Sequence, residues 1–231
     1  MSEPDHDTRY EDDEVRFLDA LSEQERAWLE ERGVRRAFPQ GHALFHEKQV
    51  SDRVMIVLEG RVKIASSTDD GRERVLAFRG PGEALGELSA IDGRPRSASV
   101  TAVDPVEALV VPTTAFRTFL EANPRVMFFL MQRLIGRLRE ADRKRVEFGA
   151  TDTIGRVAAR LVELSERYGR RTSEGVRIDL PITQEELASW VGSSREGVNK
   201  ALNTLKGLHW IDIERRSITV LDIEALRRRS G

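Results

Sequence analysis

The sequence predicts an α+β protein in which a sheet domain precedes a long helix and a small, mostly helical domain. Three observations support this prediction. Short apolar runs alternate with turn residues over residues 38–111, apolar residues recur at helical spacing over residues 123–148, and the signals of two short helices joined by a tight turn lie at residues 183–205. A chain of 231 residues is long enough to contain two such domains.

The amino-acid composition is typical of a globular protein and excludes several classes of site. Hydrophobic residues make up 39% of the chain, as in globular proteins that fold in water. The sequence contains no cysteine, which excludes disulfides and thiolate-ligated iron–sulfur clusters. The acidic N-terminus lacks an apolar signal region, and no apolar run is long enough to span a bilayer. We therefore expect a cytoplasmic protein that does not enter a membrane.

Residues 31–122 are expected to form the sheet domain. The strand-forming runs are residues 54–58, 62–65, 75–78 and 108–111. Turn residues such as Glu59-Gly60 and Gly80-Pro81-Gly82 separate them. Short strands with frequent turns are typical of an antiparallel barrel or sandwich. Residues 1–30 precede this domain as an acidic tail and a short helical pattern, which includes Phe17, Leu21, Trp28 and Leu29.

A long helix and a hinge are expected at residues 123–152. Asn123-Pro124 opens the helical pattern, and Gly149 to Asp152 is interpreted as the hinge. The predicted apolar seam of this helix consists of Leu130, Leu134, Leu138, Ala141 and Phe148. Such a seam can pack against the helix's own sheet domain or against a second copy of the chain.

Residues 153–231 are expected to form the second domain, which contains a helix-turn-helix. Thr183 and Glu186 have the spacing of a capping box, and Gly192 supplies the left-handed residue that ends the first helix. Ser193 and Glu196 repeat the capping-box spacing at the start of the second helix. Strand-like segments at residues 210–213 and 217–220 end the domain and predict a wing beside the two helices.

The second of these helices has residues that suit DNA. Its apolar residues fall on one face, and they are Val198, Ala201, Leu202 and Leu205. Arg195 can donate to guanine O6 and N7, Glu196 can accept from cytosine N4, and Lys200 can reach guanine or a phosphate. The residues expected at double-stranded DNA are Thr183, Gln184, Ser194, Arg195, Glu196, Asn199 and Lys200. The alternative is a generic pair of helices whose polar face only contacts water, because the spacing of apolar residues would be the same.

A second candidate site lies in the sheet domain, where Gly86-Glu87-Leu88 is followed by Arg96-Ser97-Ala98. Arg96 and the Ser97 hydroxyl can hold a phosphate, while Glu87 can accept a hydrogen bond from a sugar hydroxyl. Gly86 allows the backbone to approach a ligand closely. The alternative interpretation is a loop with a surface Glu–Arg pair and no ligand.

Together, the Gly86 to Ala98 segment and the Ser193 to Val198 segment resemble the family of the cyclic-AMP receptor protein and the fumarate-nitrate regulator, the Crp/Fnr family of bacterial transcription regulators. The resemblance covers residues 38–226. It implies a cyclic-nucleotide-binding β-roll, a long dimerisation helix and a C-terminal winged helix-turn-helix. It also implies a homodimer that binds a palindromic DNA site with GTGA-type half-sites and contacts RNA polymerase.

The resemblance also points to residues on the long helix. It implies that Arg137 lies near the ligand phosphate, and that positions 141 and 142 lie beside the base. Relatives that respond to cyclic AMP carry Thr and a small polar residue there, whereas this chain carries Ala141 and Asp142. Because Ala141 can neither donate nor accept a hydrogen bond, we expect weak binding of cyclic AMP. The resemblance still implies a cyclic nucleotide or a related ligand as the effector. Asp142 could accept a hydrogen bond from its base.

Other chemistries receive little support. His42 and His46 are four residues apart but lack accompanying cysteines or carboxylates, so we expect no metal site. The sequence has no P-loop, nucleophile elbow or HExxH motif, and we expect no enzyme. Two other functions stay open from the sequence. One is a regulator that binds DNA without ligand because its site is degenerate, and the other is a nucleotide-binding module with a vestigial helix-turn-helix.

Overall fold

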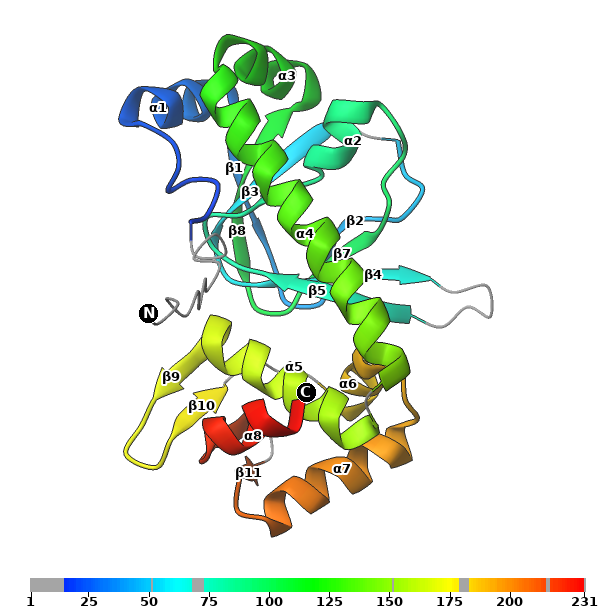
Figure 1. Ribbon diagram of the computed structural model, residues 1–231. Coiled ribbons are helices and arrows are strands. Elements are labelled where there is room, and N and C mark those ends of the chain that lie inside the picture. The colour runs from blue at the N-terminus through cyan, green and yellow to red at the C-terminus, as the bar shows by residue number, and fades with distance from the viewer. Residues whose placement is uncertain are drawn as a thin grey trace, which may run out of the picture. The chain divides into compact units, whose positions relative to one another are not determined.

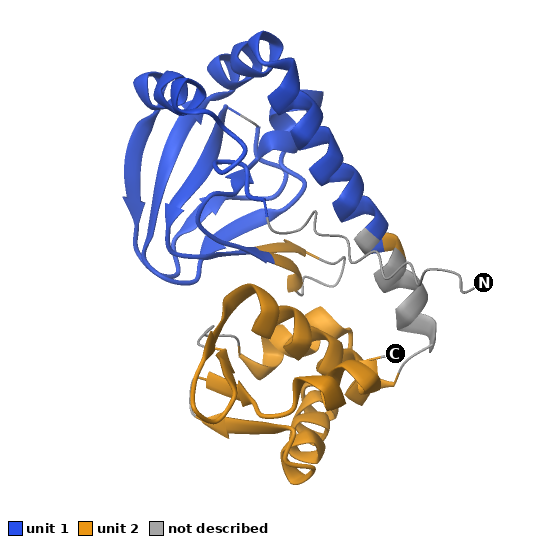
Figure 2. Cartoon of the chain, turned by 60° about the vertical axis from the view of Figure 1, so that its left-hand side comes forward, with its two compact units in different colours: residues 1–63, 78–141 blue, residues 64–77, 142–231 orange. Residues whose placement is uncertain are grey.

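The computed structural model describes residues 15–50, 52–67, 73–150, 152–178, 183–214 and 217–230, with backbone alone at residues 140 and 143–150. The predicted acidic tail at residues 1–14 lies outside the described residues. The chain divides into two compact units, one of residues 1–63 with 78–141 and the other of residues 64–77 with 142–231 (Figure 2).

Two four-stranded sheets form the predicted β-part, with strand orders β1-β8-β3-β6 and β2-β7-β4-β5 (Figure 1). The strands are β1 Val34–Phe38, β2 Ala43–Phe45, β3 Arg53–Glu59, β4 Val62–Ser67, β5 Glu73–Arg79, β6 Ala84–Leu85, β7 Ser99–Ala102 and β8 Val106–Pro112. The four apolar runs of the sequence become β3, β4, β5 and β8. The pairings of β3 with β6 and β8 are antiparallel, as are those of β1 with β8 and β2 with β7. The predicted α+β fold with an antiparallel N-terminal part is confirmed.

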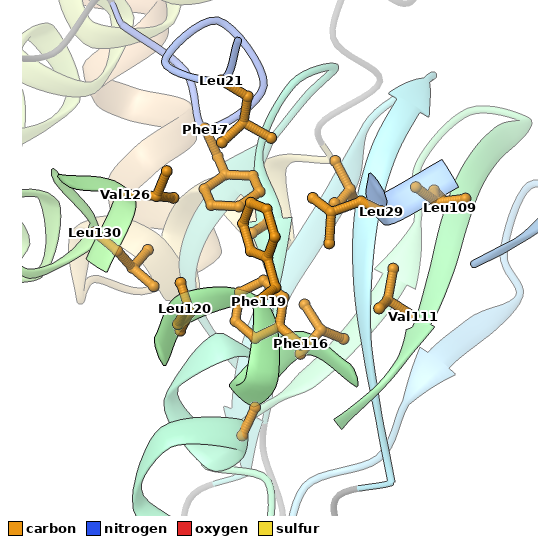
Figure 3. Close-up of a cluster of buried hydrophobic side chains, with 14 residues drawn as sticks. Phe17, Leu21, Leu29, Leu109, Val111, Phe116, Phe119, Leu120, Val126 and Leu130 are labelled. Atoms are coloured by element: carbon orange, nitrogen blue, oxygen red, sulfur yellow. The ribbon is translucent and has the colours of Figure 1, made fainter. Parts of the chain in front are cut away.

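In the described part of the first unit, four helices accompany the sheets. They are α1 Glu23–Arg32, α2 Glu87–Asp92, α3 Thr113–Ala122 and the long α4 Pro124–Ala150, whose residues 142–150 belong to the second unit. Buried side chains from α1, α3 and the start of α4 meet those of β3 and β8 in one hydrophobic core (Figure 3). The rings of Phe17 and Phe116 lie 6.0 Å apart, and those of Trp28 and Phe119 lie 5.5 Å apart. The N-terminal helix begins only at Glu23, because the Ser22 side chain caps it there.

The predicted seam of α4 divides between the two alternatives, and the side chain of Phe148 lies outside the described residues. Leu130 is 4% exposed and points into the hydrophobic core with Val126, so it is not available to a partner (Figure 3). The exposed apolar side chains with coiled-coil spacing are Phe128, Met131, Ile135 and Leu138, each between 44% and 61% exposed. We call these four residues the apolar stripe. The helix α4 continues through Gly149 and Ala150, the first two residues of the predicted hinge.

The second unit contains the predicted helix-turn-helix. Its elements are α5 Thr153–Tyr168, β9 Gly169–Arg171, β10 Val176–Ile178, α6 Gln184–Val191, α7 Arg195–Gly207, β11 Ile211–Glu214, β12 Ser217–Val220 and α8 Ile223–Ser230. The predicted wing strands are β11 and β12, and they join β10 and β9 in one sheet. The prediction that this domain ends in strands was wrong, because α8 follows. Its Leu226 is fully buried, and the Asp222 side chain accepts a hydrogen bond from the Ala225 amide at 2.8 Å.

Candidate functional site

Gly86 forms the turn at the centre of the first predicted site. Its φ is +80°, in the left-handed region, and it precedes α2 as the N-cap residue. A Cβ atom at Gly86 would lie 2.2 Å from Nη1 of Arg96 and 3.3 Å from Cε2 of Phe45. Glycine is therefore required by the backbone conformation and by the close approach of the arginine.

Arg96 is 4% exposed, and its guanidinium contacts an aromatic ring and two backbone carbonyls. Nη1 donates to the Gly86 oxygen at 2.9 Å, and Nη2 donates to the Arg53 oxygen. The guanidinium carbon lies 3.9 Å from the centroid of the Phe45 ring. We call Phe45, the Arg53 carbonyl, Gly86 and Arg96 the Arg96 cluster.

Within the described ranges, the charge of Arg96 has no carboxylate in direct contact. Among the described residues, Arg96 forms no ion pair with a carboxylate, and its buried Nε has no hydrogen-bond partner. Burial lowers the pKa of Arg96, Arg53 lowers it further, and the carboxylates of Asp52 and Glu87 oppose the shift. Because a guanidinium stays protonated in proteins, the cluster holds a buried positive charge. Such a charge is costly unless an anion comes to it.

Glu87 is the first residue of α2, and the residue as a whole is 4% exposed. Nη1 of Arg137 on α4 donates to Oε1 of Glu87 at 2.7 Å, and Nη2 of Arg137 lies 3.8 Å from Oε1 of Glu83. In the described part of the chain, the contacts of Glu87 with Arg137 use Oε1. The second carboxylate oxygen can therefore accept a hydrogen bond from a ligand hydroxyl.

The remaining predicted ligand residues differ in their exposure. Ser97 is exposed, Ala98 is buried, and the Leu88 side chain is 44% exposed. Asp142 is exposed on α4 and belongs to the second compact unit. The structure thus brings together Gly86, Glu87, Arg96 and Arg137 in the first unit. Phe45 and the Arg53 carbonyl also belong here, and sequence reasoning missed both because they are more than 40 residues from Arg96 in the chain.

The second predicted site begins with α6, whose capping box is as expected. The Thr183 hydroxyl accepts from the Glu186 amide at 3.1 Å, and Glu186 Oε2 accepts from the Thr183 amide at 2.9 Å. Gly192 ends α6 with a φ of +61°. Gln184 is half-buried in the first turn.

The predicted cap of α7 was wrong by one residue. Ser194 is the N-cap, and its hydroxyl accepts from the Gly197 amide at 3.1 Å. Ser193 and Glu196 form no capping box, so Glu196 is not required as a cap. The predicted apolar face of α7 is buried, whereas Arg195, Glu196, Asn199 and Lys200 are exposed. The start of the helix therefore offers a cationic, an anionic and an amide side chain to a ligand.

Thr153 and Ser193 bring two helix starts together in the second unit. The Thr153 hydroxyl lies 3.3 Å from the Ser193 hydroxyl, which places the first residue of α5 beside the residues that lead into α7. Arg156 reinforces this arrangement, because its Nε donates to the Val191 carbonyl at 2.9 Å. Amides at a helix start favour anions such as a phosphate. The sequence offered no signal for this pairing, since the two hydroxyls are separated by 40 residues.

Metal and membrane interpretations find no support in the described residues. No group of three or more His, Cys, Asp and Glu side chains in the described ranges could hold a metal ion. His42 instead lies against Phe38, with ring centroids 5.6 Å apart. Within the same ranges, no helix is both long and apolar enough to cross a membrane.

Two family models match the chain. The cyclic nucleotide-binding domain model matches residues 35–123, which include the Arg96 cluster. The Crp-like helix-turn-helix domain model matches residues 155–229, which include α6 and α7.

Comparison with known proteins also points to transcription regulators. The chain is 38% identical to a CRP-like cAMP-activated global transcriptional regulator of Mycobacterium tuberculosis, over 84% of this chain and 86% of that protein. It is 33% identical to the cyclic AMP receptor protein of Thermus thermophilus, over 74% and 76% of the two chains. The solved structure of FixK2 from Bradyrhizobium japonicum has the same fold, with a TM-score of 0.76, 20% identity and coverage of 86% and 98%. The expectation of a regulator and not an enzyme agrees with these relatives, and the chain belongs to the Crp/Fnr family of transcription regulators.

Proposed function

We propose that this chain acts as a homodimer that recognises a palindromic DNA site through α7 and is regulated by a cyclic nucleotide held at Arg96 and Glu87. In this proposal residues 31–122 form the ligand domain, residues 123–152 the dimerisation helix and hinge, and residues 153–231 the DNA-binding domain. The observation that carries the ligand part is the buried guanidinium of Arg96, which forms no ion pair among the described residues.

The exposed residues at the start of α7 support DNA recognition. Arg195, Glu196 and Lys200 lie on the face opposite the buried one, and a helix start of this kind enters the major groove in helix-turn-helix proteins. The hydroxyls of Thr153 and Ser193 lie beside this start, where we propose that they contact a DNA phosphate. Thr183, Gln184, Ser194 and Asn199 would complete the surface.

A DNA-binding assay with an Arg195→Ala variant tests this part. On a symmetric site with half-site centres about 34 Å apart, we expect the variant to lose about 1–3 kcal/mol of binding free energy and to relax the preference at one base pair. Lys206→Ala is the matched control, because Lys206 lies at the far end of α7 and pairs with Asp212 at 2.9 Å. An equal loss on unrelated DNA would mean that Arg195 contacts only phosphate. No preference in the wild type for any site would favour a vestigial helix-turn-helix.

The Arg96 cluster supports an anionic ligand, and the name of the Mycobacterium relative indicates cyclic AMP as its effector. We propose that Arg96 binds the ligand phosphate, aided by Ser97 and loop amides, and that the free oxygen of Glu87 accepts from the ribose hydroxyl. Gly86, Leu88 and Ala98 would shape the loop, Arg137 would hold Glu87, and Asp142 would lie beside the base.

Calorimetric titration of the purified protein with cyclic AMP, cyclic GMP and cyclic di-GMP tests the ligand. Arg96→Ala should abolish binding, whereas Arg94→Ala should not, because Arg94 is exposed two residues away. No heat of binding with any of the three nucleotides, together with unchanged DNA affinity, would favour a regulator that binds DNA constitutively.

We further propose that the dimer forms through the apolar stripe of α4 and that the DNA-bound dimer contacts RNA polymerase. The resemblance to the Crp/Fnr family implies a homodimer, and the stripe has coiled-coil spacing. A DNA-binding regulator functions where the chromosome lies, so we propose that the protein is cytoplasmic.

A further inference from the structure

We propose that Phe45 is the positioning residue of the anion site. Its ring holds the guanidinium of Arg96 in place of a carboxylate, so that the positive charge stays available to the phosphate of a cyclic nucleotide. This inference rests on the proposed ligand site, and it assigns to the last residue of β2 a task in ligand binding.

The guanidinium carbon of Arg96 lies over the face of the Phe45 ring. The guanidinium carbon of Arg96 lies 3.9 Å from the centroid of the Phe45 ring, well within the range of cation–π attraction. Phe45 is 1% exposed and Arg96 is 4% exposed, so water does not screen this attraction. The ring therefore stabilises a buried cation that the described carboxylates leave without an ion pair.

A ring and a carboxylate beside Arg96 would differ in how much of its charge and how many of its N–H groups they leave available to a phosphate. A carboxylate accepts the in-plane N–H groups and cancels the charge, so it would compete with an incoming phosphate. An aromatic ring attracts the guanidinium through its π face and carries no net negative charge. The carbonyls of Gly86 and Arg53 orient Nη1 and Nη2 without adding a negative charge. The N–H groups that these carbonyls do not use can then serve an anionic oxygen.

Backbone hydrogen bonds hold the segment after Phe45 beside Arg96. The Lys48 amide donates to the Arg96 carbonyl at 2.8 Å, and the Arg96 amide donates to the Gln49 carbonyl at 2.8 Å. The segment that follows Phe45 is thereby paired with the residue whose side chain Phe45 covers. Lys48 adopts a φ of +66°, which is unusual for a residue with a side chain and lets the chain turn there. Gly86 completes the arrangement, since a Cβ atom there would meet both Arg96 and Phe45.

A Phe that only fills the core is the competing interpretation, and a matched pair of variants separates the two. Phe45→Leu removes the ring beside Arg96, whereas Phe116→Leu removes a fully buried ring from the hydrophobic core of the same unit. Phe45→Tyr keeps a ring at the site and serves as the conservative variant. Phe45→Met, with a flexible apolar side chain, replaces Phe45→Leu if that variant does not fold.

Calorimetric titration of each full-length variant with cyclic AMP measures the effect. We expect Phe45→Leu to weaken binding about tenfold, a loss of about 1.4 kcal/mol, and Phe45→Tyr to retain most of the affinity. Phe116→Leu should lower the melting temperature while its dissociation constant stays within about twofold of the wild type. Equal affinities of wild type and Phe45→Leu, or equal weakening by Phe45→Leu and Phe116→Leu, would overturn the proposal.

An NMR measurement on the protein without nucleotide tests the role of Phe45 independently of the proposed ligand. In the ¹H–¹⁵N spectrum, the Arg96 Nε–H signal is identified by its loss in Arg96→Lys. We expect Phe45→Leu to shift this signal strongly, because the ring current of Phe45 disappears. If the wild type binds no cyclic nucleotide, the proposed ligand is wrong, yet a shifted Nε–H signal still supports Phe45 as the residue that positions Arg96. A signal that stays in place in Phe45→Leu would overturn that role.

Discussion

Arg137 on α4 donates from Nη1 to Oε1 of Glu87 on α2 at 2.7 Å, across 50 residues of sequence. The Glu87 side chain is 6% exposed and that of Arg137 is 28% exposed, so this ion pair is largely shielded from water. The bond joins the long helix to the turn that carries the anion site. A displacement of Glu87 at the start of α2 would therefore act on α4 through this hydrogen bond.

Replacing Arg137 with Ala should destabilise the first unit. The substitution leaves a nearly buried carboxylate without its cation, and we expect a loss of about 1–3 kcal/mol in the free energy of unfolding. Chemical denaturation followed by circular dichroism measures it. Arg139→Ala is the control, since Arg139 is exposed on the same helix and should change stability by less than about 0.5 kcal/mol. Equal effects of the two variants would contradict the structural importance of the pair.

Gly86→Ala should weaken ligand binding more than its backbone strain explains. A Cβ atom would meet Nη1 of Arg96 at 2.2 Å and would push the guanidinium off the Phe45 ring. Gly93→Ala is the matched control, because Gly93 has a φ of +73° and nothing within 4 Å of its Cβ position. Both variants should lose about 1 kcal/mol or more of stability from the left-handed backbone. Only Gly86→Ala should also lose affinity for cyclic AMP by calorimetry, and similar affinities in both variants would contradict this.

Charges on the apolar stripe should separate the proposed dimer. Met131→Glu with Leu138→Glu places two carboxylates on exposed apolar positions of α4. In a coiled-coil contact they would be desolvated and would repel their copies on the partner helix, so sedimentation should show monomers. Gln132→Glu with Arg139→Glu adds carboxylates to α4 outside the stripe and should leave the dimer intact. A dimer that survives the first pair would place the interface elsewhere.

Restoring polar residues on α4 should improve cyclic AMP binding. Ala141 offers no hydrogen bond, and the resemblance to cyclic-AMP-responsive regulators puts positions 141 and 142 beside the base. Ala141→Thr with Asp142→Ser should strengthen binding by about 1 kcal/mol, the net value of one hydrogen bond. The check is the dissociation constant of the wild type beside that of the double variant. Tight wild-type binding that the double variant does not improve would show that other groups recognise the base.

The second unit should become less stable in acid partly through Asp152. The hydrogen bond from the Gly155 amide lowers the pKa of Asp152, and so does Arg229, whose Nη2 lies 2.5 Å from Oδ2. Because the pKa is lower in the folded state, this stabilisation is present above the unfolded pKa and is lost as the pH falls through the folded value.

Asp152→Asn keeps a capping side chain but removes the charge. Its melting temperature should therefore depend less on pH than that of the wild type over the acid range, from about pH 5 down to about pH 2. Calorimetric melting of both proteins across this range is the measurement. Parallel pH profiles would show that the interactions of Asp152 add nothing in the folded state.

Features that a short stretch of sequence specifies were predictable. Thr183, Glu186 and Gly192 lie within one helix and its ends, and their capping roles follow from the local backbone. The four apolar runs became strands for the same reason, since chain segments of alternating turn and strand residues favour that structure locally. The sequence also predicted a site that includes Gly86, Glu87 and Arg96, because Arg96 suits a phosphate and Glu87 suits a sugar hydroxyl, and Arg96 indeed contacts Gly86.

The tertiary structure decided which of these groups meet and which faces stay exposed. Helical spacing on α4 marks several apolar positions, yet only packing against the core buries Leu130 and leaves Leu138 exposed. The contact of Phe45 with Arg96 and the bond between Arg137 and Glu87 join residues about 50 apart in the chain. Local propensities act over a few residues, whereas such contacts depend on how whole strands and helices pack, and no short pattern in the sequence specifies them.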